Sequence, residues 1–289
     1  MTKRVRKAVL PVAGLGTRVL PGAKTTPKNM LNVVDRPILS YIVEEARAAG
    51  IEHFVFIVGR GQGAIEDYFD ANPELEDQLE LKGKTDVLAQ VRADLPVPGG
   101  MSFVRQMAPL GLGHAVWCAR HIIGDEPFAV MLPDMLMAAD TPALAQVVAA
   151  HDKVGGNIIA VEPCPEGEAH KYGVVALAGR EGRLSKMTGM VEKPAPGTEP
   201  SNLFISGRYV LQPEIFEFLE RQGKGAGGEI QLTDAMAALM ASQDFHALEY
   251  EGVTYDCGDK LGLLRANVAF ALRRPDLADA ARQAIQALL

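Results

Sequence analysis

The order of its apolar segments restricts the fold of this chain more than any other feature. Residues 7–13 read as a short buried strand that runs into a glycine-rich loop, and residues 53–58 read as a second apolar strand. Between them, apolar residues recur at helical spacing over 38–49, where Asp35 is expected to cap the helix and Gly50 to end it. This order of strand, loop, helix and strand predicts one unit of an α/β sheet.

The same alternation continues to about residue 165 and then changes. Further strands are predicted at 101–105, 128–132 and 157–161, and helices at about 64–69, 113–123 and 142–151. Such alternation is typical of a doubly wound, mainly parallel sheet with helices on both faces, so the fold class is α/β. Later segments at 172–177, 183–191 and 204–211 predict a small β-rich lobe, and 260–289 predicts C-terminal helices. The chain is therefore expected to form a single domain, 1–289, with three parts at about 1–165, 166–258 and 259–289.

Positive charge is concentrated near the start of a chain that is acidic as a whole. The formal net charge is −7, which speaks against a general nucleic-acid-binding protein. Residues 1–36 nevertheless carry eight basic side chains and one acid. Four of these cations are expected to form a solvated tail, namely Lys3, Arg4, Arg6 and Lys7. Three others lie in a loop rich in Gly, Pro and Thr, where an anionic ligand is expected to bind: Arg18, Lys24 and Lys28.

The apolar runs and the cysteines indicate the cellular compartment of the protein. The first apolar stretch is broken at Pro11, too soon for the core of a signal peptide, and no run approaches the ~18–20 residues of a membrane span. Cys118, Cys164 and Cys257 are scattered singly, which is typical of a reducing compartment and argues against a thiolate metal site. We therefore expect a cytoplasmic protein that does not bind membranes.

The glycine-rich loop after the first strand is suited to bind phosphate. Glycines at 14 and 16 let backbone N–H groups approach an anion that a Cβ atom would keep away. A dinucleotide-binding fingerprint is the competing interpretation, but its third glycine is Val19 here and Pro21 follows closely. Gly83 begins a second phosphate-loop-like triplet, which is expected to be a surface turn because Gln78 occupies the first required glycine position. A single Gly-x-Gly is weak evidence, and the cations that follow it strengthen the phosphate interpretation.

Two polar residues follow predicted strands at the edge where open parallel sheets bind ligands. Asp134 comes just after the strand at 128–132, and its carboxylate is well placed for a hard metal ion; a loop-capping aspartate is the alternative. Gln106 follows the strand at 101–105, and its amide offers both a donor and an acceptor, which suits the edge of a base. The histidines show no metal-ligand spacing, and His114 is expected to be structural.

Several motifs together resemble those of a known family, the sugar-phosphate nucleotidyltransferases. Its signature is matched in order and spacing by Gly14-Leu15-Gly16-Thr17-Arg18, Pro27-Lys28 and Asp35-Arg36-Pro37. The resemblance narrows to the bacterial members that join UTP to glucose 1-phosphate through residues 41–46, 111–115, 132–134, 190–194, 207–211, 228–234 and 255–260. Asn29 and Asn32 depart from the pattern, where Glu and Pro are usual.

The resemblance implies a Rossmann-like nucleotide-diphospho-sugar transferase fold and a role for each motif. The residues implied as catalytic are Arg18 and Lys28, on the triphosphate and the leaving pyrophosphate, and Lys193, on the sugar phosphate. The implied nucleotide-binding residues are Ala13, Gly14, Gly16, Thr17, Gln106 and Gly111. The sugar is expected to meet Gly173 and Glu192, and Mg²⁺ to be bound by Asp134 and Asp256.

The same resemblance implies the reaction and the partners. UTP and glucose 1-phosphate are the expected substrates, UDP-glucose and pyrophosphate the expected products, and a homodimer or homotetramer the expected assembly. Two alternatives remain open at this point. A thymidylyltransferase on the same scaffold differs only in the base it accepts, since uracil and thymine differ by one methyl group. A non-catalytic relative that binds nucleotide sugars is expected to have lost the reactive side chains.

Overall fold

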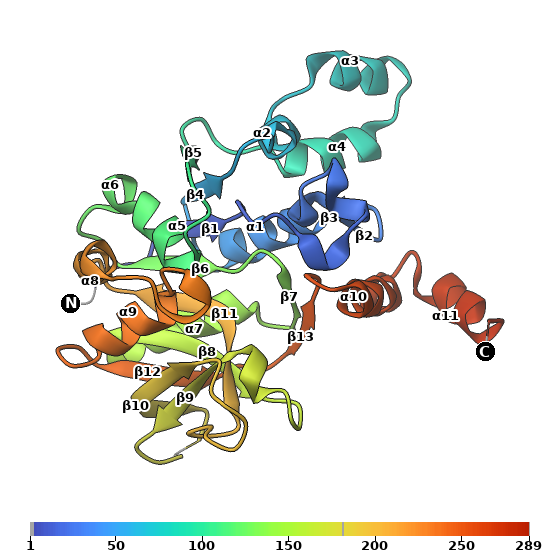
Figure 1. The fold of residues 1–289 in the computed structure, drawn as a ribbon. Coiled ribbons are helices and arrows are strands. Elements are labelled where there is room, and N and C mark those ends of the chain that lie inside the picture. The colour runs from blue at the N-terminus through green and yellow to red at the C-terminus, as the bar shows by residue number, and fades with distance from the viewer. Residues whose placement is uncertain (1–2, 181, 289) are drawn as a thin grey trace.

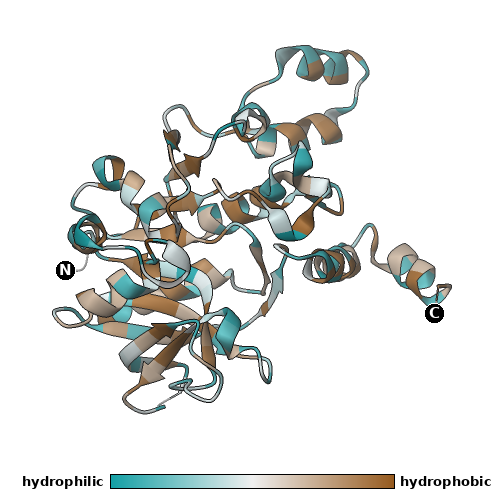
Figure 2. Ribbon diagram, in the orientation of Figure 1, coloured by the Kyte–Doolittle hydropathy of each residue, from teal (hydrophilic) through white to brown (hydrophobic). Residues whose placement is uncertain are grey.

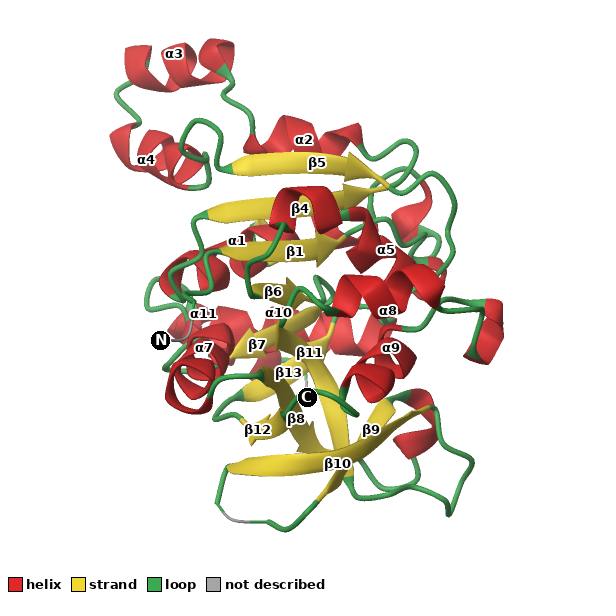
Figure 3. Ribbon diagram, turned by 90° about the vertical axis from the view of Figure 1, so that its left-hand side faces the viewer, coloured by secondary structure: helices red, strands yellow, loops and turns green. Residues whose placement is uncertain are grey.

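A nine-stranded mixed sheet organises the chain, and Figures 1 and 3 show its strands side by side. The computed structural model describes residues 3–180 and 182–288. The strand order is β5-β4-β1-β6-β11-β8-β12-β10-β9. The bounds are β1 Lys7–Pro11, β4 His53–Val58, β5 Met101–Arg105, β6 Phe128–Met131, β8 Asn157–Pro163, β9 Gly173–Leu177, β10 Leu184–Glu192, β11 Leu203–Leu211 and β12 Phe245–Glu249. Two small ribbons join β2 (Asn32–Val33) to β3 (Arg36–Pro37) and β7 (Met135–Ala138) to β13 (Val253–Asp256).

Helices cover both faces of the sheet, whose central strands are largely apolar (Figures 2 and 3). Their bounds are α1 Ile38–Ala48, α2 Gly63–Phe69, α3 Pro73–Leu81, α4 Thr85–Ala93, α5 Leu112–Cys118, α6 Arg120–Ile123, α7 Ala143–Val154, α8 Ile215–Arg221, α9 Leu232–Leu239, α10 Lys260–Arg273 and α11 Ala278–Gln286. One apolar core contains residues of α1 and α7, and a second contains residues of α5, α8 and α9. No helix in the described part of the chain is long and apolar enough to cross a membrane.

The α/β sheet predicted from the alternation is confirmed, with a difference in its second half. Strands β5, β4, β1 and β6 are parallel, whereas β11 runs antiparallel to both β6 and β8. The strand-like pieces after residue 170 join the same sheet, with β10 and β9 at one edge and β11 in the middle, between β6 and β8. At the other edge, α3 and α4 form an excursion that contacts the sheet little (Figure 1). The triplet that begins at Gly83 is the turn between these two helices, as expected.

Two local expectations for charged residues were wrong. Asp35 does not cap α1, because Pro37 is the N-cap residue, and the Asp35 carboxylate instead pairs with Arg274 at 2.5 Å. The basic residues at the start of the chain are not a free tail, although the side chains of Lys3, Arg4 and Arg6 are exposed. Lys3 donates to the carbonyl oxygen of Asp125 at 2.6 Å, and Lys7 donates to that of Ile122 at 2.9 Å. These cations lie beside carbonyl oxygens of the turn before β6, so they attach the start of the chain to the sheet.

A buried ion pair connects the layers. Arg208 on β11 is fully buried and forms a bidentate pair with Glu45 on α1, at 2.9 and 2.7 Å. The same guanidinium donates to the carbonyl oxygens of Leu132 and Met135, at 3.2 and 2.9 Å. Glu45 also accepts from the N–H of Leu144 in the first turn of α7. A buried charge is tolerated only when its hydrogen bonds are satisfied, and here two helices, two strands and one loop contribute the groups that satisfy them.

We predict that Arg208→Met lowers the free energy of unfolding by about 3–5 kcal/mol, because it leaves the Glu45 carboxylate buried without its partner. Equilibrium urea denaturation measures this loss. The matched control is Arg282→Met, which removes the exposed pair with Asp279 and is expected to cost less than about 1 kcal/mol. Equal effects of the two substitutions would contradict a special role for the buried pair.

Candidate active site

The glycine-rich loop after β1 encloses the side chain of Lys28. Gly16 has a left-handed φ of 65°, and a Cβ atom there would come within 2.8 Å of the Lys28 Cβ. A Cβ on Gly14 would lie 3.4 Å from the Lys28 Cε. Thr17 begins a short 3-10 turn (Thr17–Val19) that carries Arg18, and Ala13 lies between β1 and the loop. The two glycines therefore let the loop lie closely over a lysine from the following segment.

Two cations from the glycine-rich loop region and two carboxylates from distant parts of the chain meet here. The Lys28 ammonium lies 2.5 Å from Asp134 Oδ2. The Arg18 guanidinium lies 3.1 Å from Asp256 Oδ2 and 4.0 Å from Asp134 Oδ2. Gly258 lies between the two carboxylates, since a Cβ there would be 2.7 Å from Asp256 Oδ1 and 2.9 Å from Asp134 Oδ2. The four charges thus form one compact cluster.

The ribbon of β7 and β13 holds the two carboxylates in register. Asp256 is the last residue of β13 and pairs with Met135, the first residue of β7. The N–H of Cys257 donates to the carbonyl oxygen of Asp134 at 2.8 Å, and the N–H of Gly258 donates to Asp256 Oδ1 at 2.8 Å. Backbone hydrogen bonds therefore fix the spacing of Asp134 and Asp256 without help from their cationic partners.

The two carboxyl groups have opposite pKa shifts. Burial acts to raise the pKa of Asp134, but the adjacent Lys28 ammonium outweighs it and holds this pKa below the ordinary value. Burial also raises the pKa of Asp256, where the Arg18 guanidinium only partly offsets it and the Asp134 charge adds to it. Asp134 is therefore the more strongly ionised of the two.

The donor set at this cluster fits a hard divalent cation that also meets phosphate. In the described residues no group of three or more His, Cys, Asp or Glu side chains is arranged to bind a metal. Two carboxylates alone would leave most coordination positions of Mg²⁺ to water and ligand oxygens, which is how Mg²⁺ is bound in most nucleotide sites. The residues that fit this ion are Asp134 and Asp256.

A second group of polar side chains lies at the end of β10. Glu192 Oε2 accepts a hydrogen bond from the hydroxyl of Thr233 on α9, at 2.7 Å. A Cβ on Gly173 would come within 3.1 Å of the same oxygen, so glycine leaves space beside this carboxylate. Lys193 has a left-handed φ of 48°, and its half-exposed ammonium lies 3.7 Å from Glu192 Oε1. Burial raises the pKa of Tyr209, and the negative charges of Glu192 and Asp134 raise it further.

The residues expected to read a base lie beyond β5. The Gln106 amide nitrogen donates to the carbonyl oxygen of Gly111 at 3.2 Å. Gly111 precedes α5 with a φ of 108°, and its missing Cβ leaves room for the backbone of Ile230, whose carbonyl oxygen would otherwise be 2.7 Å away. Gly111 therefore serves the packing of the loop before α9 as well as any contact with a ligand.

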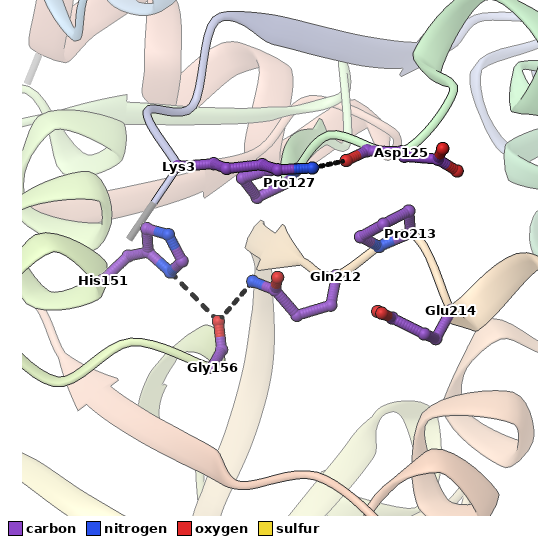
Figure 4. Close-up of a pocket in the computed structure, with 8 residues that line it drawn as sticks. All are labelled: Lys3, Asp125, Pro127, His151, Gly156, Gln212, Pro213 and Glu214. Atoms are coloured by element: carbon purple, nitrogen blue, oxygen red, sulfur yellow. Dashed lines mark hydrogen bonds between the residues drawn. The ribbon is translucent and has the colours of Figure 1, made fainter. Parts of the chain in front are cut away.

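A pocket of about 260 Å³ lies next to the amino-terminal ends of β6 and β8 (Figure 4). Gln212 donates to the carbonyl oxygen of Gly156 at 2.8 Å, and His151 Nδ1 lies 3.0 Å from the same oxygen. Several polar groups of this pocket thus bond to one another. It holds none of the expected site residues.

The structure brings together the cationic, acidic and glycine residues predicted for phosphate and metal, and it places Glu192, Lys193 and Gly173 side by side. Sequence reasoning missed Thr233 and Gly258. Both lie inside motifs that carry the family resemblance, at 228–234 and 255–260, but Asp256 is the one residue of these two motifs to which the sequence assigns a role. A hydroxyl that orients a carboxylate, and a glycine that leaves space between two carboxylates, become visible only from the contacts.

Comparison with known proteins agrees with this geometry. The nucleotidyl transferase family model matches residues 7–271, so the chain belongs to the nucleotidyl transferase family. A Bacillus subtilis relative, "UTP--glucose-1-phosphate uridylyltransferase", is 50% identical over 277 residues, 96% of this chain and 94% of the relative. A solved "UTP-bound UGPase" from Acinetobacter baumannii is 42% identical with a TM-score of 0.91, over 99% of this chain and 100% of that one. A UDP-glucose pyrophosphorylase complexed with UDP-glucose is 37% identical with a TM-score of 0.83, over 93% and 100% of the two chains.

We predict that Gly258→Ala lowers the rate of nucleotidyl transfer by about a hundredfold while the protein stays folded. The added methyl group would meet the Arg18 guanidinium at 2.6 Å and both carboxylates within 3 Å, and small displacements of reacting groups have effects of this size. Pyrophosphate release measures the rate and circular dichroism the fold. Gly223→Ala is the control, because nothing lies within 4 Å of its added methyl group. A fully active Gly258→Ala variant would refute the assignment of this cluster.

Proposed function

We propose that this enzyme converts UTP and glucose 1-phosphate to UDP-glucose and pyrophosphate. A phosphate oxygen of the sugar 1-phosphate attacks the α-phosphorus of UTP, and the bond from that phosphorus to the β-phosphate oxygen breaks. The observation that carries the proposal is the cluster of Arg18, Lys28, Asp134 and Asp256 beside a glycine-rich loop. The near full-length similarity to uridylyltransferases supports the same reaction.

The reaction requires positioning and charge rather than proton transfer. A sugar phosphate has a second pKa of about 6, so it is mostly a dianion at neutral pH. Its attack therefore needs no general base. The departing pyrophosphate gains negative charge, which preorganised cations stabilise. We assign this role to Arg18 and Lys28, which lie next to the glycine loop, with the backbone of residues 13–17 binding the triphosphate. Each of these cations pairs with a carboxylate in the structure, so both are already held in place before substrate binds.

Nucleotidyl transferases of this family use a divalent metal, and we propose Mg²⁺ for this chain, held by Asp134 and Asp256. When bound, such an ion neutralises phosphate oxygens and the developing negative charge. The two carboxylates lie at a fixed spacing because the β7–β13 ribbon sets it. Their present cationic partners show that this position favours positive charge.

The sugar and the base are assigned to two further groups of residues, at the end of β10 and after β5. Lys193 is proposed to bind the sugar phosphate, and Glu192 to accept hydrogen bonds from sugar hydroxyls where Gly173 leaves space. Gln106 and the backbone at Gly111 are proposed to read the uracil. A non-catalytic relative is disfavoured because all the proposed reactive side chains are present.

We further propose a symmetric homodimer or homotetramer that works in the cytoplasm. Helix α10 exposes an apolar stripe of Leu261, Leu264 and Val268 at helical spacing, which a second copy could cover. The cysteines of the chain are unpaired thiols, which suits a reducing compartment.

We predict that Asp134→Asn and Asp256→Asn each lower turnover at saturating substrates by about a hundredfold or more, because each removes a charged ligand of the metal. Pyrophosphate release at fixed magnesium measures this loss. The control is Asp140→Asn, which changes a fully exposed carboxylate and should leave turnover within about twofold. Near-normal turnover of either active-site variant, with the control also normal, would refute the metal assignment.

We predict that Lys193→Ala raises the KM for glucose 1-phosphate by about tenfold or more, since a charge-assisted hydrogen bond is lost. The affinity for UTP, measured by calorimetry, should change less than about twofold. Lys186→Ala is a matched control, because Lys186 lies on β10, which Lys193 directly follows, and its side chain is similarly exposed. Equal losses for UTP and for the sugar phosphate would assign Lys193 to the nucleotide instead.

A further inference from the structure

The side chain of Gln106 is held on one side by two acceptors. Its residue directly follows β5, its backbone N–H donates to the carbonyl oxygen of Val58, and its side chain is buried. Its amide nitrogen Nε2 lies 3.2 Å from the carbonyl oxygen of Gly111 and 3.0 Å from His114 Nδ1. A side-chain amide has two hydrogens, so these two contacts use both of them.

The Gly111 carbonyl oxygen fixes the orientation of the Gln106 side-chain amide. A carbonyl oxygen only accepts hydrogen bonds, so the amide atom that faces it must be the NH₂ group rather than the oxygen. The contact with His114 Nδ1 then requires that this ring nitrogen also accepts, and therefore that His114 carries its single proton on Nε2. The Cys118 thiol, a weak donor, lies 4.0 Å from the same Nδ1.

The surroundings of His114 favour this neutral form and hold the ring in place. The imidazole stacks on Trp117 with ring centroids 5.9 Å apart, and Arg120 lies over the same indole ring at 3.5 Å. Burial lowers the pKa of His114, and the Arg120 charge lowers it further, which favours the neutral ring with a single N–H at neutral pH.

The Gln106 side chain can therefore offer a ligand only its oxygen, Oε1, which accepts a hydrogen bond and cannot donate one. Its Oε1 has no hydrogen-bond partner in the described part of the chain. This oxygen is also not one of the solvent-inaccessible polar atoms without a partner, so a ligand can reach it. Uracil has a hydrogen on N3, which this oxygen can accept. Cytosine has a lone pair at N3, so the same approach would bring two acceptors together.

We propose that His114 is a specificity-determining positioning residue, which fixes the Gln106 amide with its oxygen outward and thereby favours bases that carry an N3–H over cytosine. The proposal rests on the proposed function and extends it to a residue that the sequence suggested was only structural. His114 acts through Gln106 and does not itself touch the nucleotide.

The test compares two substitutions of His114 in the full-length enzyme. His114→Leu removes the acceptor but keeps a side chain of similar bulk, whereas His114→Asn keeps an oxygen near the position of Nδ1. We expect His114→Leu to lower the ratio of kcat/KM for UTP over CTP by about tenfold, mainly through a higher KM for UTP, since one hydrogen bond orients the amide. His114→Asn should keep the ratio within about threefold of the wild type.

A third nucleotide separates base selection from general loosening of the site. Thymine also carries an N3–H, so the ratio of UTP over dTTP should stay within about twofold in His114→Leu. An unchanged ratio of UTP over CTP in His114→Leu, or an equal fall in His114→Asn, would overturn the proposal. A wild-type enzyme that does not use UTP would instead refute the proposed function.

A measurement on the wild type keeps the proposal testable if His114→Leu does not fold. The ¹⁵N chemical shifts of the His114 ring at neutral pH show which nitrogen carries the proton. The proposal requires an unprotonated Nδ1 and a protonated Nε2. A protonated Nδ1 would overturn it, because that nitrogen would then donate to Gln106 and turn the amide around.

Discussion

The buried pair of Arg208 and Glu45 is the constraint on which the arrangement of the site depends. Removing two charges from water costs more than one ion pair returns unless every remaining donor and acceptor also finds a partner. Those partners are the carbonyl oxygens of Leu132 and Met135 and the first turn of α7. Because Asp134 lies between the two carbonyl groups, satisfying a charge in the core also fixes the loop that carries a proposed metal ligand.

The charge cluster and the residues proposed to read the base follow the same physical rule, in which internal hydrogen bonds fix the orientation of a side chain that is proposed to bind a ligand. Arg18 and Lys28 are held by carboxylates, Glu192 is held by Thr233, and Gln106 is held by His114. A prepared side chain loses less conformational entropy when the ligand arrives. It also offers only one pattern of donors and acceptors, which restricts the ligands that fit.

The sequence predicted the features that depend on local pattern and missed those that depend on contacts between distant segments. The strand β4 was predicted at its observed bounds, and the glycine loop with Arg18 and Lys28 was recognised from its residue types. The ribbon of β7 and β13 was not predicted, because two four-residue segments more than a hundred positions apart carry no periodicity of their own. For the same reason the sequence did not predict the buried ion pair of Arg208, because its partner Glu45 lies on a distant helix.

The β7–β13 ribbon also has a consequence for how the chain matures. Arg18 and its partner Asp256 are separated by 238 positions, and the strand that carries Asp256 is the last one in the sequence. During synthesis the first four parallel strands can assemble while this strand is still inside the ribosome. A nascent chain can therefore form its glycine-rich loop early but acquires Asp256, the second proposed metal ligand, only near the end of translation, so incomplete chains lack the full charge cluster.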